Sequence, residues 1–587
     1  MSGSNVFCSD NTIHFIKTEV LFPMNTIKKF IHYYGPYKAV FFIDLICAAV
    51  ISLVDLAYPQ ILRTMTKTLF TQDKVMILHA LPVIAVSLFV MYIVQSLCKY
   101  YVTYQGHMMG ANMERDMRRE LFDHYQELSF SYYSRNNSGQ MMSKLVSDLF
   151  DISEFAHHGP ENLFISLVKI VGAFIFLFFI NKKLALPLII LVIVMFVFSF
   201  RQNAKMQETF MENRRKIGDV NASLQDTLSG IRVVQSFANE DIERAKFKKS
   251  NEAFLISKRD NYHCMGSFMS SNLFFQGMMY LVTLVYGGYL IAQGEMQTAD
   301  LAMYALYIGI FISPIQILVE LVEMMQKGLS GFRRFLDVME TESEIRDADN
   351  AAELTDVKGH VRYDHVSFHY SDDETPVLSD ISIDIPAGKS IALVGPSGSG
   401  KTTICSLLPR FYDVTGGSIT VDGKDIRGLT LKSLRSQIGM VQQDVYLFDG
   451  TIKDNIAYGK PDATDEEVVA AAKAAFAHSF IMRLPQGYDT ILNEEASNVS
   501  QGQKQLLTIA RTILSNPKIL ILDEATSSID TRTELMVQEA FDRLMEGRTS
   551  FIVAHRLSTI RNADEILVMK DGSIIEQGSH DELMAKG

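Results

Sequence analysis

Several features are missing from this sequence, and each absence narrows the possible functions. The five cysteines lie far apart and form no CxxC pair, so the sequence predicts neither a zinc site nor a disulfide framework. The net charge is -12, and no basic stripe is interleaved with aromatic residues, which argues against a nucleic-acid partner. No apolar run long enough to cross a bilayer occurs after residue 340. The C-terminal half is therefore expected to be a water-exposed domain.

The first half, in contrast, is dominated by long apolar runs. At 587 residues the chain is too long for one hydrophobic core, so two or more domains are expected. Six runs approach the roughly 20 residues that cross a bilayer, at about 38–62, 77–104, 160–181, 183–202, 266–292 and 300–325. We expect an N-terminal extension over 1–23, an α-helical transmembrane domain over 24–335, a linker over 336–358 and a second domain over 359–587.

Lysine and arginine predict the orientation of these spans. Two long polar connections between spans are rich in basic residues, whereas the other side has only short turns. The first carries Arg115, Arg118, Arg119, Arg135 and Lys144, and the second carries Arg214, Arg215, Lys216, Arg232, Arg244, Lys246, Lys248 and Lys249. The positive-inside bias places these connections, both termini and the C-terminal half in the cytoplasm. The sequence thus predicts a multi-pass protein of the cell membrane, and the lipid bilayer is one of its expected partners. Residues 1–23 hold no secretory signal, and either Met1 or Met24 serves as the native start.

The two polar connections each break near the tip. The stretches "SRNNSG" (134–139) and "LSGIR" (228–232) favour turns, so we expect helices that continue past the bilayer and a short helix across each tip. These short helices, near Arg135 and Ile231, are expected to contact a cytoplasmic domain.

Four acidic residues lie in or near the spans. A carboxylate that faces lipid costs several kcal/mol, so each is expected to face a watery cavity or a partner group. For Asp44 and Asp55, a substrate path and a structural role are equally favoured. For Glu320 and Glu323, an ion-paired or solvated position at the helix end is favoured.

A phosphate-binding loop is predicted in the second half. "LVGPSGSGKTT" (393–403) fits GxxxxGK[ST], and an apolar strand, "SIALV", precedes it while a helical pattern follows. Backbone N–H groups of such a loop surround phosphates, the lysine reaches the β- and γ-phosphates, and the threonine ligates Mg²⁺. The nucleotide-binding residues expected here are Gly395, Pro396, Ser397, Gly398, Ser399, Gly400, Lys401, Thr402 and Thr403.

Two consecutive carboxylates follow another apolar run. In "KILILDEATSSID" (518–530), a buried parallel strand would deliver them at its C-terminal edge, where α/β sheets bind ligands. We expect Asp523 to hold the metal and Glu524 to polarise the attacking water. A helix N-terminus at the same residues is the alternative, and Lys401 upstream argues against it.

Six further motifs carry a resemblance to a known family. "NVSQGQKQ" (498–505) resembles the signature loop of ATP-binding-cassette (ABC) transporters, and the six spans fused ahead of one ATPase domain resemble half-transporters of the type IV exporters. "VQQDVYLF" resembles the Q-loop, "FIVAHRLST" the switch region, "SSID" the D-loop, and "VSFHYS" the segment whose aromatic residue stacks on adenine. "NEEASN" stands at the position of the exporters' X-loop.

The resemblance implies a fold, an activity and a set of site residues. The fold is an α-helical transmembrane domain of six long helices plus an α/β P-loop ATPase domain, and the cofactors are ATP and Mg²⁺. Tyr370 stacks on adenine, Gln443 senses the metal and the phosphate, and His555 contacts the γ-phosphate. Ser500, Gly502, Gln503 and Asp530 complete the nucleotide site of a second half-transporter, identical or paralogous, because two ATPase domains pair head to tail.

Two departures from the family pattern bear on this interpretation. Gln501 stands where the signature usually has glycine, which restricts the backbone. "NEEASN" lacks the Gly-Glu pattern of an X-loop, and this departure bears on the coupling role expected for Glu494.

The function implied is an ATP-driven exporter of hydrophobic or amphipathic compounds such as drugs, lipids or peptides. The alternative is an ATP-gated pore or a regulatory ABC protein. A soluble ABC protein is disfavoured by the spans, and an importer by their fusion to the ATPase. The substrate and the choice between homodimer and heterodimer stay open.

Overall fold

The computed structural model describes residues 24–370, 375–493, 496–523, 530–553 and 557–586, and it divides into two compact units. We call Met1–Gln126 with Ser138–Thr341 the helical unit, and Glu127–Asn137 with Glu342–Gly587 the sheet unit. The boundary between the units falls at residues 341 and 342. A short insert from the first half also belongs to the sheet unit.

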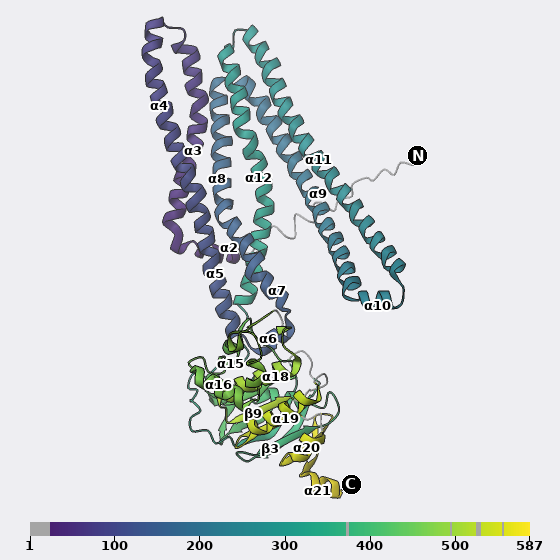
Figure 1. The fold of residues 1–587 in the computed structure, drawn as a ribbon. Helices are drawn as coiled ribbons and strands as arrows, with labels where there is room; N and C mark the ends of the chain where they lie inside the picture. Colours follow the sequence, from purple (N-terminus) through teal and green to yellow (C-terminus); the bar gives the residue numbers. More distant parts are fainter. Residues whose placement is uncertain (1–23, 371–374, 494–495, 524–529, 554–556, 587) are drawn as a thin grey trace. The chain divides into compact units, whose positions relative to one another are not determined.

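The helical unit consists of long helices and a few short ones, joined by short connections (Figure 1). In chain order these are α2 (Met24–His32), α3 (Lys38–Thr64), α4 (Lys74–Tyr101), α5 (His107–Glu127), α7 (Ser138–Ser143), α8 (Leu149–Ile180), α9 (Lys182–Ser229), α10 (Ile231–Ser236), α11 (Glu240–Ala292) and α12 (Thr298–Met339). A π-helical turn extends α3 to Leu69, and similar π-helical turns join α4 to α5 and α7 to α8. The chain therefore stays helical across each junction.

Six of the described helical stretches are long and apolar enough to cross a membrane, which confirms the number of spans expected from the sequence. They are Gly35–Leu69, Lys74–Glu127, Ser138–Ile180, Lys182–Ser229, Glu240–Ala292 and Thr298–Met339. The 53 residues of α11 extend about 80 Å at 1.5 Å per residue, well beyond a hydrocarbon core of about 30 Å. The helices therefore continue past the bilayer, as the polar connections predict.

Two helix pairs organise the helical unit. α9 and α11 pack side by side, and α10 joins them across one end (Figure 1). α8 and α12 form the other extensive pair, with Tyr304, Tyr307 and Phe311 of α12 fully buried. The hydroxyl of Tyr304 lies 2.7 Å from the carbonyl oxygens of Leu177 and Asn181 and donates its one proton between them, so even the buried phenol is satisfied.

The sheet unit is an α/β domain, as the resemblance implies. Its strands are β1 (Val361–Phe368), β2 (Leu378–Ile385), β3 (Ser390–Val394), β4 (Gly416–Val421), β5 (Lys424–Asp425), β6 (Ile438–Val441), β7 (Gly450–Thr451), β8 (Ile491–Leu492), β9 (Ile519–Asp523), β10 (Thr549–Val553), β11 (Glu565–Lys570) and β12 (Ser573–Gly578). Its helices are α6 (Phe130–Arg135), α13 (Lys401–Leu407), α14 (Leu431–Ser436), α15 (Ile452–Ala457), α16 (Asp465–Ala474), α17 (His478–Ile481), α18 (Gln501–Ser515), α19 (Thr531–Met545), α20 (Leu557–Asn562) and α21 (His580–Lys586).

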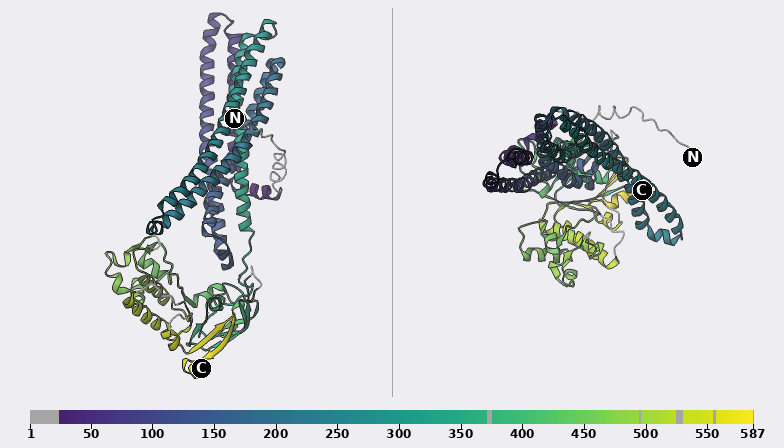
Figure 2. Two further views of the ribbon diagram at one scale, coloured as in Figure 1. Left: turned by 90° about the vertical axis from the view of Figure 1, so that its right-hand side faces the viewer. Right: turned by 90° about the horizontal axis from the view of Figure 1, so that it is seen from above.

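The main sheet has the order β12-β11-β3-β10-β9-β6. Every pairing in it is parallel except β11 with β12, which lie side by side in yellow in the left view of Figure 2. The central strands "SIALV", "ILILD" and "TSFIV" are almost continuously buried, as expected for parallel strands covered on both faces. A second sheet, β2-β1-β4-β5, is antiparallel.

The first of the two expected tip helices is α6, and it is part of the sheet unit. The ring of Phe130 stacks on that of Phe411, with centroids 5.2 Å apart, and meets the ring of Tyr412 edge-on. At the other end of α6, Arg135 forms an ion pair with Glu344 at 2.6 Å. The second expected tip helix is α10, whose Val233 is exposed, as is Phe237 directly after it.

Candidate nucleotide site

The strand register brings four loops to one edge of the main sheet. Val553 of β10 lies opposite Leu393 of β3 on one side and Asp523 of β9 on the other. On the far side of β9, Leu522 pairs with Val441 of β6. All four strands are parallel, so their carboxyl ends meet at the edge where open α/β sheets bind ligands. The chain segments that leave these strands carry the P-loop, the paired carboxylates, the switch region and the Q-loop.

The P-loop glycines are required by close packing. A Cβ atom at Gly395 would lie 2.2 Å from the carbonyl oxygen of Met569, a backbone atom that cannot move aside. Gly400 adopts φ +98 and precedes the first residue of α13, a backbone conformation that other residues rarely adopt. The predicted strand and helix on either side of the loop are confirmed as β3 and α13.

Lys401 lies inside the loop that precedes it. Its side chain is buried, and Nζ donates to the carbonyl oxygens of Gly395 and Pro396 at 2.8 Å. Ser399, also buried, offers its Oγ at 3.5 Å. The loop thus wraps around the ammonium group. An anion that enters the loop would replace these carbonyl contacts with charge-assisted hydrogen bonds.

The two threonines after Lys401 face different ways. Thr402 is exposed, so its hydroxyl is available to a ligand at the mouth of the loop. Thr403 is buried, and its Oγ1 lies 3.2 Å from the hydroxyl of Tyr370. The ring of Tyr370 is held edge-on by Phe368 and Tyr412 and is 37% exposed, which leaves a partly open aromatic surface next to the loop.

Asp523 is the last residue of β9. Burial raises the pKa of the Cys405 thiol on α13, and the negative charge of Asp523 raises it further. Gln443 follows β6 and is exposed. Glu524, His555 and Glu494 fall outside the described residues.

The signature stretch begins a second helix. Ser500 is the N-cap of α18, where its hydroxyl accepts from the backbone N–H of Gln503 while the Gln503 side chain accepts from the Ser500 N–H. Gln501 is the first residue of α18 and is exposed, and Gly502 behind it is buried. Gln501 is not among the described residues with positive φ, so no glycine is needed at this position.

Asp530 forms a further helix cap. Its carboxylate accepts from the backbone N–H of Thr533 at 3.0 Å at the start of α19. This hydrogen bond lowers the pKa of Asp530, so the group is anionic at neutral pH.

Two features of the site had no signal in the sequence. The hydrogen bond between Thr403 and Tyr370 and the aromatic support from Tyr412 join residues that no motif links. Only the three-dimensional packing of β1, α13 and the segment after α13 brings them together.

Comparison with known proteins decides the family. The family model for the ABC transporter transmembrane region matches residues 41–315, and that for the ABC transporter matches residues 378–527. The chain is 42% identical over 562 residues to the uncharacterized ABC transporter ATP-binding protein YwjA of Bacillus subtilis, covering 96% of this chain and 97% of the relative. The chain belongs to the ABC transporter family.

Two further relatives place this ABC transporter among the exporters. The putative multidrug export ATP-binding/permease protein YgaD of Bacillus subtilis is 35% identical over 568 residues, with 96% of this chain and 97% of the relative covered. The structure of a bacterial Atm1-family ABC exporter with ATP bound is similar with a TM-score of 0.74 and 29% identity, covering 94% of this chain and 96% of that one. The predictions of a type IV half-transporter, of an ATPase coupled to export and of a dimer are thereby confirmed.

The ABC transporter is a multi-pass protein of the plasma membrane with a cytoplasmic ATPase domain, as predicted. Its sheet unit is that ATPase domain, and its helical unit is the transmembrane region.

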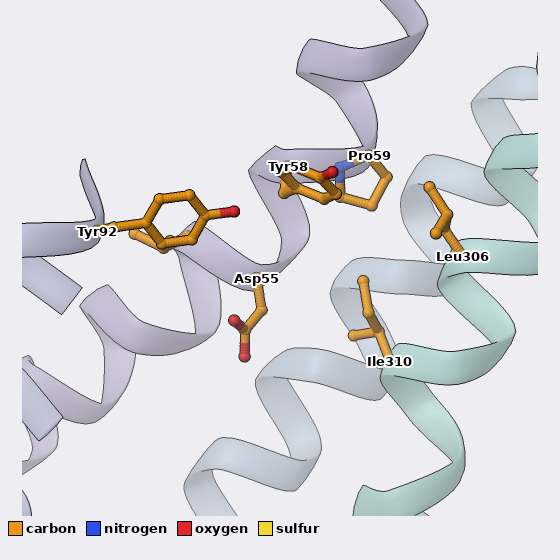
Figure 3. Close-up of a pocket in the computed structure, with 7 residues that line it drawn as sticks. Asp55, Tyr58, Pro59, Tyr92, Leu306 and Ile310 are labelled. Atoms are coloured by element: carbon orange, nitrogen blue, oxygen red, sulfur yellow. The ribbon is translucent and has the colours of Figure 1, made fainter. Parts of the chain in front are cut away.

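A pocket of the transmembrane region is lined in part by one of the four acidic residues. Asp55 of α3 lies beside a cavity of about 190 Å³ lined by side chains of α3, α4 and α12 (Figure 3). Its carboxylate also forms an ion pair with Lys169 of α8 at 2.6 Å and accepts from Gln95 of α4 at 2.7 Å. Asp55 therefore has both a partner group and access to a pocket.

The other three acidic residues differ in their surroundings. Glu323 forms an ion pair with Lys327 at 2.6 Å, the arrangement favoured from the sequence, and Glu320 is exposed. Asp44 is buried at 3% exposure, and its Oδ1 has no hydrogen-bond partner among the described residues.

Proposed function

We propose that two copies of this chain form an exporter with two competent ATP sites, which moves lipophilic or amphipathic compounds out of the cytoplasm. The observation that carries the proposal is the meeting of the loop around Lys401 with the end of β9 at one sheet edge. Lys401, Ser500, Glu524 and His555 are all present, so two copies need no paralogous partner.

Each of the expected site residues would have a distinct role. Lys401 and the N–H groups of the P-loop bind the β- and γ-phosphates, and the exposed face of Tyr370 supports adenine. Thr402, Gln443 and Asp523 carry the oxygen ligands that suit Mg²⁺, which would neutralise phosphate charge. Glu524 polarises the attacking water, and His555 keeps it aligned with the γ-phosphate.

The second copy would complete each site. Ser500 caps a 15-residue helix whose N-terminal N–H groups carry partial positive charge, which suits the γ-phosphate held by the partner's Lys401. ATP contacts that exist only when the domains close would favour the closed, outward-facing state, because a ligand shifts an equilibrium by its differential affinity. α6, and in our proposal α10, transmit this closure to the long helices.

The substrate class is proposed from the transmembrane region and from relatives. The spans are rich in methionine and phenylalanine, which adapt to varied apolar ligands. The pocket beside Asp55 combines tyrosine and aliphatic side chains with one carboxylate. Relatives named for multidrug export favour the same class.

Replacement of Glu524 by Gln tests the catalytic assignment. We expect ATP binding to persist and steady-state hydrolysis to fall about 100-fold or more, because the water loses its base. Glu576→Gln, an exposed position of β12, is the matched control and should keep normal turnover. Hydrolysis by Glu524→Gln near the normal rate would refute the assignment. The mass of the complex purified after expression of this chain alone tests the homodimer.

The alternative of an ATP-gated pore is tested with inverted vesicles. Accumulation of a lipophilic dye against its gradient, dependent on ATP, supports the exporter. Conductance without accumulation supports the pore instead.

A further inference from the structure

A cluster of three histidines lies in the helical unit, apart from the nucleotide site. His107 begins α5, and His157 and His158 lie next to one another on α8. One nitrogen atom from each ring lies within 4.8 Å of the other two. The ring centroids are 4.7 Å apart for His107 and His157, 4.9 Å for His107 and His158, and 4.1 Å for His157 and His158.

His157 is held as a ligand would be. Its side chain is 3% exposed, and Nδ1 lies 2.7 Å from the carbonyl oxygen of Ser153. A carbonyl oxygen only accepts, so Nδ1 carries the proton and Nε2 of the neutral ring keeps its lone pair. Nε2 is buried and has no hydrogen-bond partner among the described residues. Metal-bound histidines are typically oriented in this way, with the second nitrogen donating to a carbonyl.

The backbone of α5 approaches this ring directly. A Cβ atom at Gly110 would lie 2.5 Å from Nδ1 of His157 and 3.0 Å from Oγ of Ser153. Glycine at this position therefore allows α5 to approach α8 closely enough for His107 to reach the two histidines of α8. The contact fixes the His157 ring on one side.

Carboxylates surround the three imidazoles. Oε1 of Glu154 lies 3.9 Å from Nε2 of His157, and Oε2 lies 4.0 Å from Nε2 of His158. Glu161, whose side chain is 8% exposed, lies 3.7 Å from Nδ1 of His158. Buried Asp44 packs against Gly106, the residue before His107. Within the described part of the chain, no lysine or arginine forms an ion pair with these three acids, and only Lys99 of α4 interacts electrostatically with Asp44, so a bound cation would balance the remaining negative charge.

We propose that His107, His157 and His158 bind a divalent transition-metal ion of the Zn²⁺ class, with Glu154 as the fourth ligand. Imidazole with carboxylate suits Zn²⁺ and its neighbours in the first row, whereas Mg²⁺ and Ca²⁺ prefer oxygen alone. Tetrahedral Zn²⁺ with bonds of 2.0–2.1 Å holds its nitrogen ligands about 3.4 Å apart. Side-chain rotations that move each ligand atom by about 1 Å would bring the three nitrogen atoms to this spacing.

The site has a structural consequence and an access route. A metal ion there would join α5 to α8 and so restrain the two helices relative to one another. His107 follows the predicted span 77–104, and His157 precedes the predicted span 160–181. The cluster therefore lies at the span ends assigned to the cytoplasm, where free metal ions can reach it.

Co²⁺ binding to the full-length protein tests the proposal. We use detergent-purified, nucleotide-free protein without a histidine tag, stripped with EDTA. One equivalent of Co²⁺ per chain should give the intense visible absorption of four-coordinate cobalt, and Zn²⁺ should abolish it. The double variant His107→Ala/His158→Ala should bind at least about 100-fold more weakly, because two ligands are lost. Zn²⁺ should also raise the thermal midpoint of the wild type, but not that of the double variant.

The control is His79→Ala. His79 is exposed on α4, and its Nδ1 contacts a carbonyl oxygen four residues earlier, as that of His157 does, but it lies outside the cluster. This variant should bind Co²⁺ as the wild type does. If the double variant does not fold, His107→Gln alone, at an exposed position, should weaken binding at least about 10-fold. Wild-type protein without the cobalt absorption, or variants of the cluster that bind as tightly as His79→Ala, would overturn the proposal.

Discussion

The ring of Phe130 in α6 stacks on the ring of Phe411 in the ATPase domain, with centroids 5.2 Å and planes 23° apart. The guanidinium of Arg435 covers Phe411 at 5.4 Å, and Tyr412 contacts both Phe130 and Tyr370 edge-on. An unbroken series of aromatic contacts thus joins a segment that lies between transmembrane helices to the proposed adenine-binding residue. Movement at the nucleotide has a short physical path to α6.

Phe130→Ala should separate ATP hydrolysis from transport. Replacing a fully buried phenylalanine by alanine costs about 3–5 kcal/mol of stability. The cost should be smaller for Phe130, because this residue is 47% exposed. We expect hydrolysis within about threefold of normal and ATP-dependent dye accumulation reduced about 10-fold. Both are measured in the same proteoliposomes. Ile575→Ala, an exposed position on β12, should change neither. Equal losses of hydrolysis and transport would argue against a coupling role for the stack.

Gly395→Ala should weaken ATP binding. The added Cβ would lie 2.2 Å from the Met569 carbonyl oxygen, so the loop must move away from β11 and can no longer surround the phosphates. We expect ATP affinity to fall at least about 10-fold, measured by fluorescent-nucleotide displacement. Gly428→Ala has open space around its Cβ and should bind ATP normally. Normal ATP affinity in Gly395→Ala would show that the loop adapts.

Much of this architecture was predictable because its signals are local. Span length and the strand–loop–helix pattern around Lys401 depend on neighbouring residues, and both appear in the structure. Ion pairs between distant helices, such as Asp55 with Lys169, depend on helix rotation and depth, which a single sequence does not fix. The sequence does not indicate the histidine cluster for the same reason, since His107 and His157 are 50 positions apart and share no motif.

Gln501→Gly should leave ATP hydrolysis nearly unchanged, although glycine is usual at this position in the family. Gln501 is the first helical residue of α18, is exposed and has no positive φ, so its backbone does not need glycine. We expect hydrolysis within about twofold of normal and a stability loss of at most about 1 kcal/mol from the greater backbone freedom. A gain in hydrolysis above about fivefold would show that the glutamine side chain hinders the site.

Asp55→Asn should lower the stability of the transmembrane region and leave substrate selection unchanged. The change breaks the ion pair that joins α3 to α8 and leaves Lys169, whose side chain is 19% exposed, without its partner. Such contacts between membrane helices contribute about 1–2 kcal/mol. We expect a lower thermal midpoint and similar losses in transport of cationic and neutral dyes. The exchange Asp55→Lys/Lys169→Asp should restore the midpoint. Selective loss of cationic dyes, with an unchanged midpoint, would instead support charge selection by Asp55.

Asp300→Ala should be the most destabilising of these substitutions. The Asp300 side chain is 6% exposed and forms ion pairs with Arg63 at 2.8 Å and Lys67 at 2.7 Å. It also accepts a hydrogen bond from the backbone N–H of Gln297 at the start of α12. Its loss leaves two cations without an anion and removes a helix cap, which we expect to cost about 3 kcal/mol. Thermal unfolding in detergent, followed by the loss of native fluorescence-detected size-exclusion signal, measures the effect. Glu295→Ala breaks the exposed ion pair with Lys183 and should cost at most about 1 kcal/mol. Similar thermal midpoints for Asp300→Ala and Glu295→Ala would show that the ion pairs of Asp300 do not stabilise the contact between α3 and α12.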